Sequence, residues 1–322
     1  MEYKIAWFTE GGWQGKVQRN HPNMRNDMAW MHTLDVTNHP IQTIHQITEQ
    51  YDIGIVTLPK TNIDKISQYP LIESMRKVCK KIGTMQEGPH WYFQDYSMEE
   101  QIWFYNVLTE LDFIWCHNEI DKRYYTGLTN KKCYVNPTLM LEDQIKSVEV
   151  ENKSGVMIGG NMVRWYGGFD SYIVAQEFNT DIYAPSMGRK IDREDEMDIN
   201  HLPYMTWVEW INNLSKYKYG VHLMPTWAAG TFTLNCAYHG IPCIGYRGLD
   251  TQEKLHPLLS VDYGDVSSAR KLAKKLNEDD DFYKECSEMC KNLYLNSAFG
   301  EKQYIYTMKK VMREVINVKT RR

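Results

Sequence analysis

The 322-residue sequence lacks the short motifs of several large enzyme classes. It has no GxxxxGK[ST] phosphate loop, no HExxH zinc helix and no GxSxG nucleophile turn, and no cysteine or histidine pair has zinc-site spacing. The glycine-rich turn at residues 11–15 reads GGxxG, which does not match the GxGxxG dinucleotide signature. The sequence therefore gives no support to a P-loop, zincin, serine-hydrolase or dinucleotide-dependent activity.

Paired cysteines and long apolar runs are also missing. The seven cysteines form no CxxC pair, and their odd number argues against a closed disulfide framework, so we expect most of them to be buried apolar residues. No apolar run reaches membrane-spanning length, and residues 1–10 read as a strand rather than a signal peptide, so we expect a cytoplasmic protein without a membrane span. The acidic run 192–198 lacks a glycine-framed loop, so no metal site is expected there.

What the sequence does contain is a strand and helix alternation that starts twice. At this length two domains are expected, and the charged, aperiodic stretch 141–154 is the best boundary between them. We predict an α/β protein with Rossmann-like domains over 1–145 and 146–322, facing each other across a cleft. The C-terminal helix could pack back on the first domain. Ten Trp and 22 Tyr favour aromatic linings for a sugar or base, although aromatic residues are as often plain core.

The stretch 225–246, PTWAAGTFTLNCAYHGIPCIGY, reads as loop, helix and buried strand. Gly230 permits a tight entry, and Thr231 or Thr233 is expected to cap the helix that follows. The N–H groups and positive dipole end at a helix start form an anion site, so a diphosphate could bind here without metal. The alternative is an ordinary capped helix of an αβ unit.

Other second-domain residues fit the same ligand. A strand at 155–158 leads into the turn Gly159-Gly160, and Arg164 follows it, where a guanidinium would neutralise a leaving diphosphate. Asn235 could hydrogen-bond a ribose hydroxyl, and Tyr204 could stack on a nucleobase. The alternatives are a surface arginine, a solvated asparagine and ordinary packing at a helix start.

In the first domain, QEGPHW at 86–91 places an acid and an imidazole after a predicted strand. A carboxylate or imidazole at that position could accept the proton of an attacking hydroxyl, although a solvated turn glutamate is the alternative. The capping-box patterns at Ser97–Glu100 and Thr206–Glu209 predict two helix starts.

These segments resemble a known family. GTFTLNCAYHGIPCIGYRGLDTQEKLHPLL is similar to the donor-binding segment of GT-B glycosyltransferases, and GGNMVRW resembles the turn that supplies an arginine to the diphosphate. The resemblance implies that Thr231 and Thr233 meet phosphate and that Arg164 pairs with it. Asn235 falls where many members have a ribose-binding glutamate. QEGPHW falls where several inverting members place their base, which implies Glu87, with Asp95 in reserve.

The expected function is metal-independent and cofactor-independent transfer of a sugar from a nucleotide donor, with UDP-sugar first, to a hydroxyl acceptor. The predicted donor contacts are Gly12, Gly160, Arg164, Tyr204, Gly230, Thr231, Thr233 and Asn235. The predicted acceptor contacts are Trp13, Arg25, His90 and Trp91, and the predicted catalytic residues are Glu87 and Asp95.

Three other functions stay open. The layout is also similar to phage DNA glucosyltransferases, whose acceptor is a hydroxymethylated base. Lys16, Arg19, Arg25 and the Arg321-Arg322 tail would then contact phosphates, although the net charge of −4 argues against that acceptor. A noncatalytic sugar-nucleotide binding module is suggested by Asn235 in place of the acid, and a sugar-nucleotide epimerase would share the architecture.

Overall fold

The computed structural model describes residues 2–58, 63–67, 69–86, 88–145, 150, 152–160, 162–185 and 193–317, without the side chains of residues 64, 65, 144 and 164. It divides the chain into two compact units. Unit 1 comprises residues 1–21, 26–138 and 301–322, and unit 2 comprises residues 22–25 and 139–300. The domain boundary predicted from the sequence follows residue 145, whereas in the structure the chain passes from unit 1 to unit 2 between Thr138 and Leu139.

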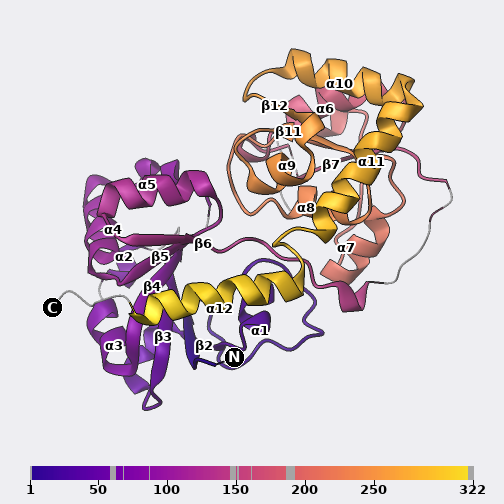
Figure 1. The fold of residues 1–322 in the computed structure, drawn as a ribbon. Helices are drawn as coiled ribbons and strands as arrows, with labels where there is room; N and C mark the ends of the chain where they lie inside the picture. The colour runs from indigo at the N-terminus through magenta and orange to yellow at the C-terminus, as the bar shows by residue number, and fades with distance from the viewer. Residues whose placement is uncertain are drawn as a thin grey trace. The chain divides into compact units, whose positions relative to one another are not determined.

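Unit 1 is a six-stranded, wholly parallel sheet with helices on it (Figure 1). The strand order is β2-β1-β3-β4-β5-β6. Its strands are β1 (Ile5–Thr9), β2 (Thr37–Pro40), β3 (Tyr51–Thr57), β4 (Cys79–Gln86), β5 (Phe113–Cys116) and β6 (Lys132–Val135). Its helices are α1 (Asp27–Thr33), α2 (Ile63–Ile66), α3 (Leu71–Val78), α4 (Met98–Glu110), α5 (Glu119–Thr129) and α12 (Glu301–Asn317), with 3-10 turns η1 (Ile41–Gln46) and η2 (His90–Asp95).

Unit 2 has a second six-stranded parallel sheet, in the order β12-β11-β10-β7-β8-β9. Its strands are β7 (Val156–Ile158), β8 (Ile182–Ala184), β9 (Asn200–His201), β10 (Tyr219–His222), β11 (Cys243–Tyr246) and β12 (Ser260–Val261). Its helices are α6 (Gly168–Ala175), α7 (Trp207–Leu214), α8 (Thr231–Tyr238), α9 (Asp250–Leu255), α10 (Val266–Glu278) and α11 (Asp280–Leu295). Its 3-10 turns are η3 (Glu142–Gln144), η4 (Arg164–Tyr166), η5 (Gln176–Phe178), η6 (Glu194–Glu196) and η7 (Pro257–Leu259).

The strands read from the sequence are continuous apolar runs because both faces of each sheet are covered. β7, β10 and β11 are buried along their whole length, as is β5 in unit 1. All seven cysteines are free and buried, which confirms their expected role as small core residues. The α/β class and the two parallel sheets predicted from the sequence are therefore present.

The last helix returns to the first unit, as Figure 1 shows for α12. Its Tyr304 is fully buried and donates a hydrogen bond from Oη to Asn136 Oδ1 (2.7 Å). At the start of α12, Glu301 accepts two hydrogen bonds from the guanidinium of Arg19 (2.8 and 2.9 Å). A bidentate arginine pair fixes geometry as well as charge, so it helps to hold α12 on unit 1.

Candidate functional site

The strand order in unit 2 has a switch point between β7 and β10. From β7 the chain builds outward to β8 and β9 on one side and to β10, β11 and β12 on the other. In open parallel sheets, ligands bind outside the carboxyl ends of the strands at this point. Gly159 and Gly160 directly follow β7, and Gly160 has φ of +100°, a conformation that glycine adopts readily. The glycine turn predicted from the sequence is therefore present at the switch point.

Helix α8 starts beside this turn and has an N-cap that differs from the one expected. Gly230 is the N-cap, with φ of +68°, and no side chain caps the helix by a hydrogen bond. The expectation that Thr231 or Thr233 caps it is wrong. The Thr233 hydroxyl points inward, donates to the Gly230 carbonyl (3.0 Å) and lies 2.6 Å from the Thr251 hydroxyl. The positive end of α8 is thus left without a side-chain cap, as an anion site requires.

Gly230 could not be another residue without rearrangement. A Cβ on it would lie 2.0 Å from Thr251 Oγ1, and its carbonyl also accepts a hydrogen bond from that hydroxyl (3.0 Å). The α9 residue Thr251 therefore holds the N-cap of α8 in place. The sequence singled out Gly230 but gave no sign of Thr251, because the two lie 21 positions apart.

His222, the last residue of β10, lies between the glycine turn and the first turn of α8. A Cβ on Gly159 would be 2.6 Å from the His222 ring and 2.4 Å from the ring of Phe232, and the two rings meet edge to face at 5.3 Å. His222 is 5% exposed, and burial lowers its pKa to about 4, so the ring is neutral at pH 7. Its sequence position gave no reason to single it out.

The three other residues predicted to bind the sugar donor, Asn235, Tyr204 and Arg164, differ in their burial and position. Asn235 is 1% exposed, and its amide, correctly oriented, donates to the Thr231 carbonyl and accepts from Trp210 Nε1, both at 3.2 Å. Its hydrogen bonds therefore join α8 to α7 within the protein. Tyr204 is 74% exposed in the loop before α7, and Arg164 begins η4.

In unit 1 the order of strands changes direction at β1, which is followed by Gly12 and Trp13. Gly12 is exposed, and Trp13 is half-buried with its carbonyl accepting a hydrogen bond from Asn38 Nδ2 (2.8 Å). Gly12 thus belongs to unit 1, whereas the other predicted donor residues belong to unit 2. Arg25 belongs to unit 2 and not, as expected, to the first domain, since the N–H of Trp207 donates to the Pro22 carbonyl (2.7 Å).

Unit 1 contains a histidine–aspartate pair after the ends of β4 and β5. His90 Nδ1 and the His90 backbone N–H both contact Asp121 Oδ1, at 2.8 and 3.1 Å. Asn118 caps α5 by accepting from the Asp121 N–H (2.8 Å), and its amide donates to Asp121 Oδ2 (3.1 Å). The His90 ring also stacks on Tyr124, with ring centroids 4.2 Å apart.

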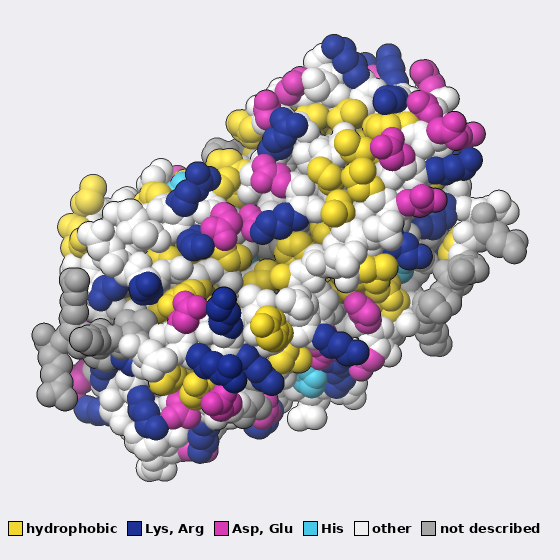
Figure 2. Space-filling model, viewed as in Figure 1, with side chains coloured by type: hydrophobic (Ala, Val, Ile, Leu, Met, Phe, Trp, Pro, Cys, Tyr) yellow, Lys and Arg dark blue, Asp and Glu magenta, His cyan; other side chains and the backbone are white. Residues whose placement is uncertain are grey.

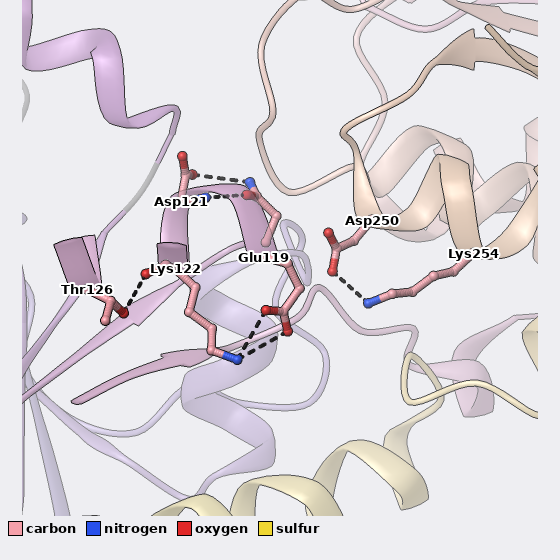
Figure 3. A network of polar contacts seen from close by, with 7 residues as sticks. Glu119, Asp121, Lys122, Thr126, Asp250 and Lys254 are labelled. Atoms are coloured by element: carbon pink, nitrogen blue, oxygen red, sulfur yellow. Dashed lines mark hydrogen bonds and ion pairs between the residues drawn. The ribbon is translucent and has the colours of Figure 1, made fainter. Parts of the chain in front are cut away.

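Figure 3 shows Asp121 in the first turn of α5 beside the Glu119–Lys122 ion pair. That pair and the Asp250–Lys254 pair on α9 both involve exposed lysines, and such surface pairs contribute little free energy. Asp121, in contrast, is fully buried and accepts from His90, so its carboxylate has a positioning role. Because a carboxylate only accepts, Nδ1 of His90 carries the proton, and the lone pair of the neutral ring is on Nε2.

Two other predicted residues of unit 1, Trp91 and Asp95, lie in the same 3-10 turn η2 as His90. Trp91 is half-buried in η2 and its ring is 6.2 Å from that of Tyr92. Asp95 is exposed at the end of η2. Glu87, the predicted base, lies outside the described residues. Asp121 was missed by sequence reasoning, although an Asn three residues before an Asp after a buried strand is a recognisable helix-start signal.

Basic residues do not form a continuous surface on the face shown in Figure 2, where acidic and basic side chains are interspersed. Lys16 pairs with Asp35 (2.6 Å) and Arg19 with Glu301, so two of the residues expected to meet DNA phosphates are paired with carboxylates. Within the described ranges, no group of three or more His, Cys, Asp or Glu side chains is arranged to hold a metal ion. No described helix is long and apolar enough to cross a membrane.

No protein family profile and no curated protein sequence matches this chain. Solved structures do. HepE from Anabaena, solved with UDP-glucose, has a TM-score of 0.69 at 9% identity over 97% of this chain and 100% of its own. The chain has the GT-B fold. Sucrose-phosphate synthase from Thermosynechococcus elongatus gives 0.68 at 9% identity, covering 98% of this chain and 100% of that one.

A third GT-B structure is longer than this chain. The pneumococcal O-GlcNAc transferase GtfA, solved with UDP and GlcNAc, has a TM-score of 0.62 at 10% identity. The match covers 86% of this chain and 60% of GtfA. At such identities the similarity establishes the arrangement of strands and helices, and the chemistry has to come from the side chains of this chain.

Proposed function

We propose that this GT-B protein is a glycosyltransferase that moves a sugar from a nucleoside diphosphate sugar, with UDP-sugar first, to a hydroxyl acceptor. The observation that carries the proposal is the β7–β10 switch point of unit 2. There the Gly159-Gly160 turn and the start of α8, which no side chain caps, lie side by side. Structures of the same fold with UDP or UDP-glucose bound support the choice of donor.

In this proposal unit 2 holds the donor. The diphosphate accepts hydrogen bonds from N–H groups at the start of α8, including those of Thr231 and Thr233, and the Gly160 turn lets its backbone approach closely. Arg164 pairs with the phosphates, and Tyr204 stacks on the base. Asn235 is left out, because its amide already bonds Thr231 and Trp210. As the sugar–phosphate bond breaks, negative charge grows on the diphosphate, and the α8 dipole and guanidinium stabilise it without a required metal.

Unit 1 supplies the acceptor side. We assign His90 as the general base of an inverting reaction and Asp121 as the residue that positions it. Nε2 of His90 accepts the proton of the acceptor hydroxyl as its oxygen forms a bond to the anomeric carbon and the nucleoside diphosphate leaves. The Asp121 carboxylate then stabilises the imidazolium. Trp91 and Trp13 offer apolar ring faces to the acceptor.

Glu87 remains the competing base, with Asp95 as its reserve, and a pair of variants separates the two assignments. Loss of turnover in His90→Asn with full activity in Glu87→Gln supports the histidine, and the opposite pattern supports the glutamate. In both variants UDP affinity should stay unchanged, because neither side chain belongs to unit 2.

The proposed function is tested by a thermal-shift panel of UDP-, GDP-, ADP- and CMP-sugars, followed by an assay for transfer and donor hydrolysis. A ligand that binds only the folded protein raises the melting temperature, so stabilisation by one nucleotide class identifies the donor. No stabilisation by any of them and no turnover would overturn the proposal. Stabilisation without transfer or hydrolysis would indicate a binding module instead.

A further inference from the structure

His222 is a buried imidazole whose two ring nitrogens both lack a hydrogen-bond partner in the structure. Two other histidines of unit 2 differ. His256 contacts the Thr233 carbonyl through Nε2 (3.0 Å), and His239 contacts the Ile211 carbonyl (2.6 Å). Leaving a buried polar group without a partner costs free energy, so native proteins supply a partner, an ordered water or a ligand. His222 therefore requires an explanation that its two neighbours do not.

The position of the ring narrows the explanation. Gly220, two residues earlier and on the same face of β10, lies against the sulfurs of Cys236 and Cys243 under α8, so His222 also faces that helix. The ring is in contact with the backbone of Gly159 and with Phe232, the second residue of α8. These are the glycine turn and the helix start that form the proposed diphosphate site. The imidazole thus lies directly beside the residues of that proposed site.

The ring is suited to donate rather than to act as a base. Its pKa is lowered by burial alone, with no acidic side chain contributing to the shift, so near neutral pH it carries one N–H and no charge. A phosphate oxygen is an acceptor, and a hydrogen bond from a fixed neutral donor to an anion is strong where water is excluded. The chemical class that fits is a diphosphate, bound in the orientation that α8 also favours.

We propose that His222 is a binding residue of the donor, donating a hydrogen bond from its imidazole to the diphosphate. This inference rests on the proposed function and adds to it a residue that neither the motif nor the spacing had indicated. It also gives a reason for glycine at 159, since any larger residue there would displace the ring, with Cβ 2.6 Å from ring Cγ.

The test compares two substitutions of His222 with a control at His239, which lies at the C-terminal end of α8, away from the helix start that His222 contacts. His222→Phe keeps a flat buried ring and removes the donor, whereas His222→Gln keeps an N–H donor. His239→Phe changes a half-buried neutral histidine at the C-cap of α8, away from the proposed site. Affinities for UDP and uridine are measured by calorimetry on the full chain, and folding is checked by thermal unfolding.

We expect His222→Phe to bind UDP about 10- to 100-fold more weakly, because a hydrogen bond to a charged group is lost. The affinity for uridine, which has no phosphate, should stay within about twofold of the wild type. His222→Gln should recover part of the UDP affinity, and His239→Phe should retain all of it. In 15N-histidine spectra, UDP should shift the His222 signals of the wild type, an effect that a purely structural histidine would not show.

Unchanged UDP affinity in a folded His222→Phe protein, or equal losses for UDP and uridine, would overturn the inference and indicate that buried water satisfies the ring. If His222→Phe does not fold, the His222→Gln affinity and the wild-type spectra decide. Failure of the wild type to bind UDP or any other nucleoside diphosphate is a different result, because it refutes the proposed function itself.

Discussion

Replacing Asp121 by asparagine tests the proposed chemistry with the smallest change in shape. Asp121 Oδ1 accepts from two N–H groups of His90, and Oδ2 accepts from the Asn118 amide (3.1 Å). An asparagine has one oxygen and one NH2 in place of the two oxygens. Whichever way the amide turns, its NH2 faces a donor, either Asn118 or His90.

The magnitude follows from those two orientations. If the oxygen stays towards His90, the ring keeps its tautomer, but the imidazolium formed during proton transfer loses its carboxylate. The difference between a charged and a neutral partner is about 1–2 kcal/mol, or roughly 5- to 30-fold in kcat. If the NH2 turns towards His90, the ring has to reverse its tautomer, and Nε2 can no longer accept a proton. The loss then approaches the full contribution of general-base catalysis, about 100- to 10,000-fold.

The assay is steady-state transfer with the donor that the thermal-shift panel identifies, together with calorimetry for UDP. We expect Asp121→Asn to lower kcat by at least about fivefold, to leave the affinity for UDP unchanged and to shift the pH–rate profile, which a merely structural role would not move. Glu119→Gln is the matched control, since this exposed neighbour pairs with Lys122 in the same turn. Wild-type kcat with an unchanged pH profile in a folded Asp121→Asn protein would refute the assignment of His90 as base.

Three further predictions concern unit 2. Burial of their rings holds the pKa of His222, His239 and His256 at about 4, against 6.5 when unfolded, so the unfolded chain binds more protons between these values and stability falls as pH falls. The free energy of unfolding measured in urea should be lower at pH 5 than at pH 7 by about 2 kcal/mol per histidine. A midpoint that does not change with pH would contradict this. Gly230→Ala should destabilise the protein by about 1–3 kcal/mol and weaken UDP binding, because Cβ would collide with Thr251 at a φ of +68°; an unaffected melting temperature would count against the described N-cap. Transfer activity should persist in protein dialysed against EDTA, and recovery only on adding a divalent metal would disprove metal independence.

The parts of the fold that the sequence predicted are those set by local signals. The capping boxes Ser97–Glu100 and Thr206–Glu209 are both present. In each, the first side chain accepts from the backbone N–H of the glutamate, and the glutamate side chain accepts from the backbone N–H of the first residue. The apolar spacing of Met28, Trp30, Met31 and Leu34 predicts a helix over about residues 23–36. The observed helix α1 is shorter, at Asp27–Thr33, because residues 22–25 join the other unit and Asn26 takes a φ of 48°. A tertiary contact overrode the helical periodicity there, and periodicity alone carries no information about such contacts.

In the candidate site, too, the residues that local signals specify could be predicted, and those that depend on distant contacts could not. Gly160 and Gly230 could be singled out because a glycine at a turn or N-cap is a local requirement, and both have positive φ. The hydrogen bonds of Asn235 could not be predicted, because its partner Trp210 comes from another helix. Asp121 was missed because its role depends on His90, 31 positions earlier in the chain. Contacts between distant segments set the chemistry, and sequence patterns do not show those contacts.

The two histidines show how one side chain is given opposite roles by its surroundings. His90 shares a hydrogen bond with the buried Asp121 side chain, so the ring proposed to take a proton has an acidic group beside it. His222 lies among Gly159 and Phe232, where burial holds its pKa near 4 and keeps it a neutral donor. A base has to change charge during turnover, whereas a residue that binds a diphosphate has to keep its N–H in place. Placing the acid next to His90 and not next to His222 is therefore the arrangement that proton removal in unit 1 and anion binding in unit 2 both require.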